Sequence, residues 1–377
     1  MTIFDLPLEQ LRQRTSLKWR TYPDDVLPLW VAEMDCRPAP EVTETLSRAI
    51  HAGDTGYPVG TGYEQAYAAY AADVWGWEFD PRRQAIIVPD VMQGIIAVLD
   101  LLGERGAPVV VNPPVYPQFY KYLGWAGREV VEAPLTAEGR IDLATLEAAF
   151  TRTDGPQPEA YLLCNPHNPH GTVPTREELA AVAELANRHG VRLVSDEIHA
   201  PLVATTTRHV PLLSVPGTEE AVIVSSASKS WNLAGLKAGL AIGGSAVAER
   251  LLGMPDQVTH SASHLGVLAH VAALTEARGW LTELMGEVQA NKQLLSDLLA
   301  DQLPEVGFRV EPATYLAWLD CRALGLADPY RSFLQAGVAL NNGVDFGTGG
   351  VGHVRMNLAT SPEIITEAVR RMAAVRG

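Results

Sequence analysis

The sequence predicts an α/β fold in which a mostly parallel central sheet is covered by helices on both faces. Short, continuously apolar runs give the first indication, because a strand that is buried on both faces lacks the polar alternation of a surface strand. These runs alternate with helical segments, as parallel strands joined by helical crossovers require. The predicted strands cover residues 85–88, 108–111, 128–132, 161–164, 191–194, 221–224 and 239–242.

The beginning of the chain is predicted to be an arm followed by helices. Residues 27–32 are apolar, but proline within them disfavours a central strand, so we expect an arm that packs against the folded protein. A helix is predicted from Pro40, which suits a first turn, to the residue before Gly53. A turn-rich loop over residues 55–62 then leads into an alanine-rich helix over residues 63–75.

The chain of 377 residues exceeds what one simple core fills, so we expect it to divide into domains. Residues 51–245 should form a large ligand-binding domain, and residues 246–377 should form a smaller α+β domain that residues 1–50 join. The large domain should also contain helices over residues 91–102 and 175–189. After residue 245 the pattern changes to segments predicted as helices over 262–275, 280–299 and from Pro362, and strands over 315–319 and 354–358.

Composition limits the classes of function. The formal net charge of −15 disfavours binding to nucleic acid or to an anionic membrane surface, which depend on clustered Lys and Arg. Cys36, Cys164 and Cys321 are widely spaced and form no C-x-x-C motif, which fits a reducing cytoplasm and not a disulfide framework. No apolar run approaches the length that spans a bilayer, and the N-terminus lacks a signal-peptide pattern. A soluble cytoplasmic protein with a small-molecule ligand is therefore expected.

Lys229 is the residue around which the candidate chemistry is organised. It follows the predicted strand over residues 221–224 and stands among small, apolar and aromatic neighbours, unlike a solvated lysine. Ser226 and Ser228 precede it, and small hydroxyl groups beside a lysine suit a phosphate held near a reactive amine. Taken alone, the stretch is explained as well by an ordinary strand-to-loop junction whose lysine reaches solvent.

Polar residues that follow other predicted strands decide between these interpretations. Asn165 follows the strand over residues 161–164, and Asp196 and His199 follow the strand over residues 191–194. In open parallel sheets, ligands bind beyond the carboxyl ends of the strands. The helix predicted from Val91 would bring its N-terminal amides, which can hold an anion, to the same edge. A lysine, a carboxylate and phosphate donors together are what a pyridoxal phosphate enzyme needs.

Ordered motifs then identify a family. Asn165-Pro166 to Gly171, Asp196 to His199 and Ser226 to Lys229 resemble the motifs of fold-type I, class I/II aminotransferase-like enzymes, nearly from end to end. The branch that the chain most resembles is the carbon–sulfur lyase group, the bacterial cystathionine β-lyases of the maltose-regulator type. The residues that carry this finer resemblance are 18–19, 27–35, 196–199, 228–232 and 315–320.

The resemblance implies a role for each site residue. Lys229 would form the Schiff base with pyridoxal 5'-phosphate and act as the base at the substrate Cα, and Asp196 would pair with the pyridine nitrogen. Asn165 and His199 would contact the ring oxygen. Ile198 and Tyr116 would pack against the two faces of the ring, and Tyr116 is also a candidate catalytic residue. The phosphate would be bound by Met92, Gln93, Ser226, Ser228 and Lys237. Substrate contacts are expected from Arg355, which would grip the carboxylate, and from Asn165, Trp30 and Ala32.

The resemblance also implies a homodimer, in which Tyr57 would reach the phosphate of the neighbouring subunit's cofactor. Residues 347–352 fit G-x-G-x-x-G but precede a predicted strand, so a dinucleotide site is not expected there. His167 and His170 lie on a proline-broken loop, so a metal site is not expected there either. Cys36 and His170 depart from the branch pattern in segments that could border the active site, which makes the substrate uncertain.

The expected function is a pyridoxal phosphate-dependent carbon–sulfur β-lyase acting on L-cystathionine or a related cysteine S-conjugate. An aminotransferase remains an alternative, because it needs the same lysine and the same electron sink. A regulator that acts through a protein partner is a second alternative, although the intact Lys229, Asp196 and Arg355 favour catalysis. A lyase for a bulky S-conjugate in a specialised pathway is the third, suggested by Cys36 and His170.

Overall fold

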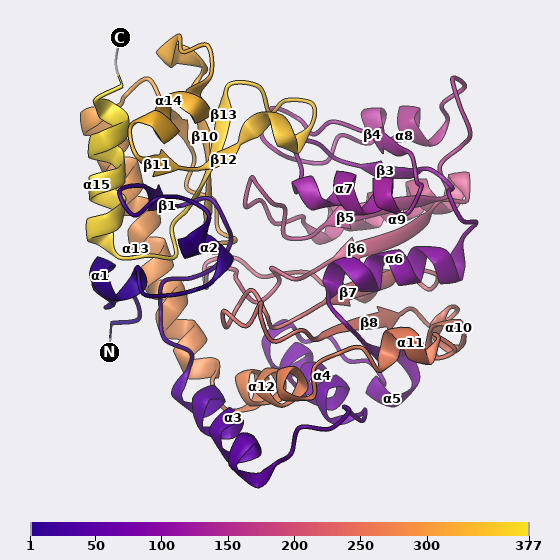
Figure 1. Cartoon of the computed structure of the whole chain (residues 1–377). Coiled ribbons are helices and arrows are strands. Elements are labelled where there is room, and N and C mark those ends of the chain that lie inside the picture. Colours follow the sequence, from indigo (N-terminus) through magenta and orange to yellow (C-terminus); the bar gives the residue numbers. More distant parts are fainter. Residues whose placement is uncertain (1, 376–377) are drawn as a thin grey trace.

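A seven-stranded sheet is the central element of the computed structural model, which describes residues 2–375 (Figure 1). The neighbouring strands β7, β6, β5, β3 and β4 pair in parallel in this order, whereas β8 is antiparallel to both of its neighbours. This confirms the predicted mostly parallel sheet. The strand order is β2 (Ala85–Val88), β8 (Gly239–Gly243), β7 (Val222–Ser225), β6 (Arg192–Asp196), β5 (Ala160–Cys164), β3 (Val109–Val111) and β4 (Val130–Glu132).

The strands of this sheet are mostly apolar on both sides, since helices cover both faces. In β5, Leu162 belongs to one hydrophobic cluster and Tyr161 and Leu163 to another. The first cluster is shared with α6 (Val91–Leu102), α7 (Pro117–Trp125) and α10 (Ala248–Leu252). The second is shared with α4 (Gly62–Trp75), α8 (Leu143–Phe150), α9 (Arg176–His189) and α12 (His264–Thr275).

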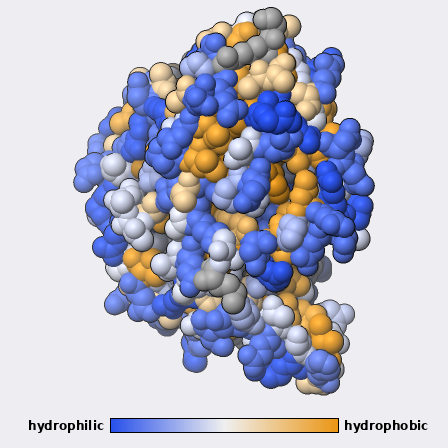
Figure 2. All heavy atoms as spheres, turned by 90° about the vertical axis from the view of Figure 1, so that its left-hand side faces the viewer, coloured by the Kyte–Doolittle hydropathy of each residue, from blue (hydrophilic) through white to orange (hydrophobic). Residues whose placement is uncertain are grey.

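A smaller α+β part completes the molecule. Its antiparallel sheet has the order β12 (Asn341–Asn342), β13 (His353–Asn357), β10 (Leu316–Asp320) and β9 (Gly307–Phe308). The N-terminal arm joins it, because β1 (Leu27–Pro28) pairs with β11 (Val338–Ala339). The helices α13 (Arg278–Gln302) and α15 (Pro362–Ala373) pack against each other. Figure 2 shows this side of the molecule, where mostly hydrophilic residues surround smaller apolar patches.

The helices that directly follow residue 245 do not belong to the smaller part. Helix α10 packs on β2 and β8, and α12 packs on α4 and on α3 (Pro40–Ala52). Within α13, Leu281 to Val288 join the core of the large sheet, and Leu295 to Leu299 join the core of the small one. We propose that the boundary falls inside α13, later than the predicted position at residue 245.

Most predicted helices and strands occur within a few residues of their expected positions. The short helices α7 and α8 were not predicted, since they are too short for a clear amphipathic period. No helix among residues 2–375 is both long enough and apolar enough to cross a membrane. The remaining helices are α1 (Leu8–Leu11), α2 (Leu17–Arg20), α5 (Pro81–Gln84), α11 (Asp256–Thr259), α14 (Pro329–Gln335), η1 (Leu212–Ser214), η2 (Arg322–Leu324) and η3 (Gly343–Phe346).

Candidate active site

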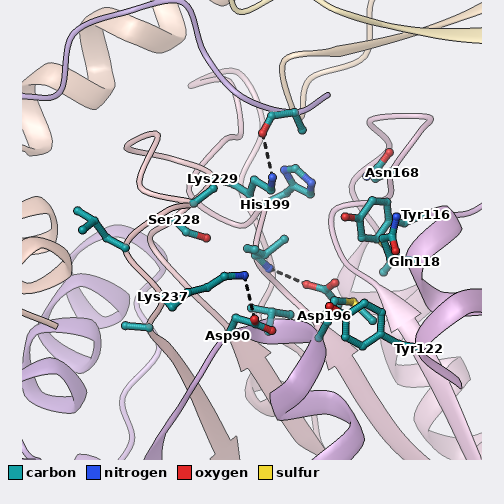
Figure 3. Close-up of a pocket in the computed structure, with 18 residues that line it drawn as sticks. Asp90, Tyr116, Gln118, Tyr122, Asn168, Asp196, His199, Ser228, Lys229 and Lys237 are labelled. Atoms are coloured by element: carbon teal, nitrogen blue, oxygen red, sulfur yellow. Dashed lines mark hydrogen bonds and ion pairs between the residues drawn. The ribbon is translucent and has the colours of Figure 1, made fainter. Parts of the chain in front are cut away.

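A pocket of about 240 Å³ lies where the carboxyl ends of the central strands meet the N-terminus of α6 (Figure 3). Strand β6 ends in Asp196, and the segment after β7 carries Lys229. Helix α6 contributes its first residues, and the N-terminal arm contributes Ala32. The predicted site residues that line the pocket are Ala32, Met92, Tyr116, Asp196, Ile198, His199, Ser228, Lys229 and Lys237.

The Lys229 amine lies between the arm and the large domain. Its Nζ donates a hydrogen bond of 2.9 Å to the carbonyl of Ala32, which also accepts one of 3.2 Å from the Tyr315 hydroxyl. Burial, together with the nearby charge of Arg355, lowers the pKa of Lys229 to about 8. A pKa this near physiological pH leaves a substantial minority of the amine in the neutral form, which is the form that acts as a nucleophile or a base.

Asp196 is a buried carboxylate that forms no ion pair within residues 2–375. Its Oδ1 accepts a hydrogen bond of 3.0 Å from the Ile198 amide. Burial is the main cause that raises the pKa of Asp196 to about 7; the Ile198 hydrogen bond and Lys229 oppose this shift, and Glu197 adds to it. A carboxylate in this condition is stabilised by a ligand that brings a positive nitrogen into the pocket, as protonated pyridine does.

His199 is a second buried polar side chain in the pocket. Burial lowers the pKa of its imidazole to about 3, so the ring is neutral, and its Nδ1 has no hydrogen-bond partner among the described residues. The pocket also has apolar and aromatic walls in Ile198 and Tyr116. Together with Lys229 and Asp196, these groups fit pyridoxal phosphate. Tyr122 and Gln118 also line the pocket and were not predicted from the sequence.

The end of the pocket nearest α6 fits a phosphate, although two of the groups predicted to contact it have other partners. Met92 lies in the first turn of α6, whose early amides have no acceptor inside the helix. Ser228 and Lys237 lie opposite (Figure 3). The Gln93 amide is not available, because it donates to the Asp90 carboxylate at 2.9 Å. The Ser226 hydroxyl also has two hydrogen-bond partners already, because it donates to the Ala238 carbonyl and accepts from the Ser228 amide.

Asn165 does not line the pocket and its amide has other partners, so its contact with cofactor and substrate stays a prediction. The Asn165 amide donates to Glu197 Oε1 at 3.2 Å and to the Val210 carbonyl at 3.1 Å, behind the pocket wall. The second asparagine of the same motif, Asn168, lines the pocket instead. Its Oδ1 accepts a hydrogen bond of 2.9 Å from Arg355 Nη1, which leaves the Asn168 amide nitrogen for a ligand.

Substitution of each asparagine by alanine should give different defects. Asn168→Ala should weaken ligand binding by about tenfold, since a hydrogen bond to a charged group contributes about 1.5–3 kcal/mol. Asn165→Ala should instead lower the melting temperature, because it removes one donor to the buried Glu197 carboxylate and the side-chain donor to the Val210 carbonyl. The measurements are substrate KM and thermal unfolding of both variants. A larger KM effect from Asn165→Ala than from Asn168→Ala would contradict the assignment.

Arg355 lies beside the pocket and not on its surface. Its side chain is 3% exposed, and its Nη2 donates to the Trp30 carbonyl and to Asn341 Oδ1. Trp30 therefore contacts Arg355 through its backbone, and does not line the pocket as expected of a substrate contact. Arg355 Nε is buried without a partner among the described residues. The binding of a substrate carboxylate by Arg355 stays a prediction, which this unpaired donor supports.

Known proteins with this architecture share a family with the chain. The family model for aminotransferase class I and II matches residues 24–372. The chain belongs to this family. A Mycobacterium leprae member, provisionally named a cystathionine beta-lyase, is 51% identical over 97% of this chain and 96% of its own length. The cystathionine beta-lyase of Corynebacterium glutamicum is 32% identical over 98% of both chains.

Solved structures of aminotransferase class I and II members agree. A Corynebacterium diphtheriae protein, provisionally described as a PLP-dependent beta-cystathionase, superposes with a TM-score of 0.93. It is 34% identical, and the match covers 100% of this chain and 98% of that one. The family and the fold-type I architecture predicted from the motifs are therefore confirmed.

Cys36 and His170, which depart from the branch pattern, lie outside the pocket. Cys36 is 1% exposed and contacts Asn232, and His170 lines a separate groove beside Trp318. The two departures from the branch pattern therefore do not shape the pocket, which removes the reason to expect a bulky substrate. Residues 347–352 lead into β13, a strand, as expected.

A buried pair of side chains, Tyr63 and His270, which was not predicted from the sequence, supports the loop that carries Lys229. The Tyr63 hydroxyl lies 3.0 Å from His270 Nδ1 and accepts a hydrogen bond of 3.3 Å from the Ala227 amide, two residues before Lys229. Helix α12 can approach the other side of the loop because a side chain at Gly266 would collide with the Leu236 carbonyl. The partners are about 200 positions apart, so no local pattern could indicate them.

Proposed function

We propose that this chain is a pyridoxal phosphate-dependent carbon–sulfur β-lyase acting on L-cystathionine or a related cysteine S-conjugate. The products would be a thiol, pyruvate and ammonia, with one water consumed. The observation that carries the proposal is a lysine amine with a lowered pKa, Lys229, that shares one pocket with the buried Asp196 carboxylate. The named cystathionine beta-lyase at 32% identity over nearly the whole chain supports this reaction over others.

Each site residue would have one role in the reaction. Pyridoxal phosphate, when bound, supplies an aldehyde for an amine and a ring that accepts electrons from the substrate Cα. Asp196 would keep the ring nitrogen protonated, and Arg355 would grip the substrate carboxylate with its planar fork. Lys229, whose Nζ donates a hydrogen bond to the Ala32 carbonyl, would remove the Cα proton. His199, neutral at physiological pH, would contact the ring oxygen.

The direct test is incubation of the purified protein with L-cystathionine, followed by assays for pyruvate and free thiol. Equal amounts of both products are expected from an elimination. A lysine-bound chromophore that borohydride abolishes would establish the cofactor independently of turnover. Absence of both products with cystathionine and with smaller S-conjugates would refute the lyase activity.

An aminotransferase is the second candidate, because the family match and one further relative favour it. A Mycobacterium tuberculosis protein described as a probable N-succinyldiaminopimelate aminotransferase is 30% identical over 77% of this chain. An aminotransferase would release a keto acid from an amino acid alone and leave the cofactor as its amine. Release of keto acid without free thiol or ammonia would favour this candidate over the lyase.

We also propose a cytoplasmic homodimer in which Tyr57 completes the partner's site. The loop between α3 and α4 lies at one end of the molecule in Figure 1 and exposes apolar side chains, since Tyr57 is 87% exposed and Val59 is 82% exposed. Such side chains favour an interface. The buried free thiols of Cys36, Cys164 and Cys321 agree with a reducing compartment.

Tyr57→Ala should weaken cofactor binding by about tenfold, the scale of one lost hydrogen bond to a charged group. Because the hydroxyl would act across the interface, subunits carrying Tyr57→Ala and subunits carrying Lys229→Ala should complement each other. Mixed dimers would then contain one intact site, and mixing after unfolding should restore part of the activity. Lack of recovery in dimers shown by mass spectrometry to be mixed would contradict the shared site.

A further inference from the structure

The wall that fits the cofactor phosphate contains a carboxylate. Asp90 caps the N-terminus of α6 and lines the pocket, where its side chain is 16% exposed. Its Oδ1 accepts from the Gln93 amide at 2.9 Å, and its Oδ2 lies 3.0 Å from Lys237 Nζ. Figure 3 shows this ion pair beside Ser228, between the start of α6 and the segment that carries Lys229.

The ion pair changes the charge that a phosphate would meet. Of the described residues that line the pocket, Lys229 and Lys237 carry the ammonium groups, and only Lys237 lies at the phosphate end. Its side chain is 58% exposed, and its ammonium group already forms an ion pair with Asp90. A phosphate monoester carries about −1.5 to −2 charges at neutral pH. Such a ligand gains attraction from Lys237 and from the amides of α6, but it is repelled by Asp90.

Capping of α6 does not require this negative charge. Asparagine and serine cap helix N-termini about as well as aspartate does. The chain itself caps α12 with Ser263 and α9 with Thr175, and both hydroxyls accept from the first turn. Aspartate is an ordinary cap in this chain, since Asp80, Asp142 and Asp328 cap α5, α8 and α14, but the contact of Asp90 with Lys237 is specific to the pocket.

We propose that Asp90 competes with a bound phosphate for Lys237 and thereby lowers the affinity of the pocket for phosphate ligands. The carboxylate imposes an electrostatic penalty on every phosphate ligand in the pocket. A ligand that also engages Lys229 through an aldehyde offsets the penalty, whereas a phosphate ester without an aldehyde does not. Phosphate ligands that do not react with Lys229, such as inorganic phosphate and esters without an aldehyde, are therefore expected to bind weakly. The inference rests on the proposed use of pyridoxal phosphate and is independent of which bond the enzyme cleaves.

Asp90→Asn tests the proposal, because asparagine keeps the cap and removes the charge. Dissociation constants of cofactor-free protein are measured by calorimetry for pyridoxal phosphate, for pyridoxine 5'-phosphate, which lacks the aldehyde, and for pyridoxal, which lacks the phosphate. Both phosphate ligands should bind on the order of tenfold more tightly to the variant, as expected when a like charge is removed nearby. Pyridoxal should bind equally to both proteins.

Asp142→Asn is the matched control, since Asp142 caps α8 in the same way and does not line the pocket. It should leave all three constants unchanged. Lys237→Met should weaken the phosphate ligands, and adding Asp90→Asn should recover part of that loss. Equal or weaker phosphate binding by a folded Asp90→Asn protein would overturn the proposal and make Asp90 a positioning residue for Lys237. Failure of the wild-type protein to bind pyridoxal phosphate would instead overturn the proposed cofactor, and this inference with it.

Discussion

Lys229→Ala is expected to abolish covalent retention of pyridoxal phosphate and to reduce pyruvate formation by at least about 10²- to 10⁴-fold. Positioned proton transfer alone accounts for a loss of this size. The amine occupies a defined place, because Nζ is held by the Ala32 carbonyl and its pKa is lowered to about 8. Alanine leaves neither a nucleophile nor a base at that place. Borohydride treatment followed by mass spectrometry of the intact protein reports the covalent link, and a pyruvate assay reports turnover.

A surface lysine provides the control for this substitution. Lys121 is exposed on α7 and does not line the pocket, so Lys121→Ala should keep both readouts at the wild-type level. Lys229→Arg keeps a positive charge but lacks a nucleophilic amine, and it should be as inactive as Lys229→Ala. A borohydride-stable mass increase that persists in Lys229→Ala would show that another amine carries the cofactor.

The strands of the large sheet could be predicted closely because burial on both faces leaves a simple pattern. Strand β2 and helix α6 occur where the apolar runs placed them, and Asp196 and Lys229 lie at or just beyond the ends of strands that share one sheet edge. The chemistry of the pocket could therefore be predicted from the polar residues at the carboxyl end of each strand. The division after residue 245 was less predictable, because a single helix, α13, contributes to both cores.

The two asparagines of the motif show where sequence reasoning ends. Asn165 and Asn168 lie in one proline-broken loop, where no helical or strand period indicates which side chain faces the pocket. The choice depends on distant partners: Glu197 and the Val210 carbonyl hold Asn165, whereas Arg355 holds Asn168. Asp90 was also overlooked, because its partner Lys237 lies 147 positions away in the chain.

Asp196→Asn should lower the rate of pyruvate release by about 10²- to 10³-fold or more, the scale of losing one preorganised electrostatic partner. Asparagine has the shape of aspartate and can keep the bond from the Ile198 amide, but it cannot stabilise a positive ring nitrogen. The proton that makes the ring an electron sink would then be lost. Because Lys229 is unchanged, the cofactor should still be retained, and the defect should appear in kcat. A variant within fivefold of the wild-type kcat, on the order of 1 kcal/mol, would exclude this role for Asp196.

The same substitution should change how the stability of the cofactor-free protein depends on pH. The folded-state pKa of Asp196 is raised from 3.8 to about 7 by burial, so the protonated carboxyl is preferred in the folded protein. Its contribution to stability is present below pH 4 and is lost as the pH rises through 7, by up to about 4 kcal/mol. The asparagine side chain cannot ionise, so Asp196→Asn should become more stable than the wild type across this interval.

Urea unfolding of both cofactor-free proteins at a series of pH values between 4 and 8 measures this difference. The cofactor-loaded proteins should show the opposite order near pH 7, because a positive nitrogen beside Asp196 favours its ionised form and turns a buried charge into a paired one. The carboxylate would thus be a source of instability in the empty pocket and a source of affinity in the filled one. Parallel pH profiles of the two cofactor-free proteins would show that Asp196 is ionised without a partner, and that the pocket does not favour a cationic ring in this way.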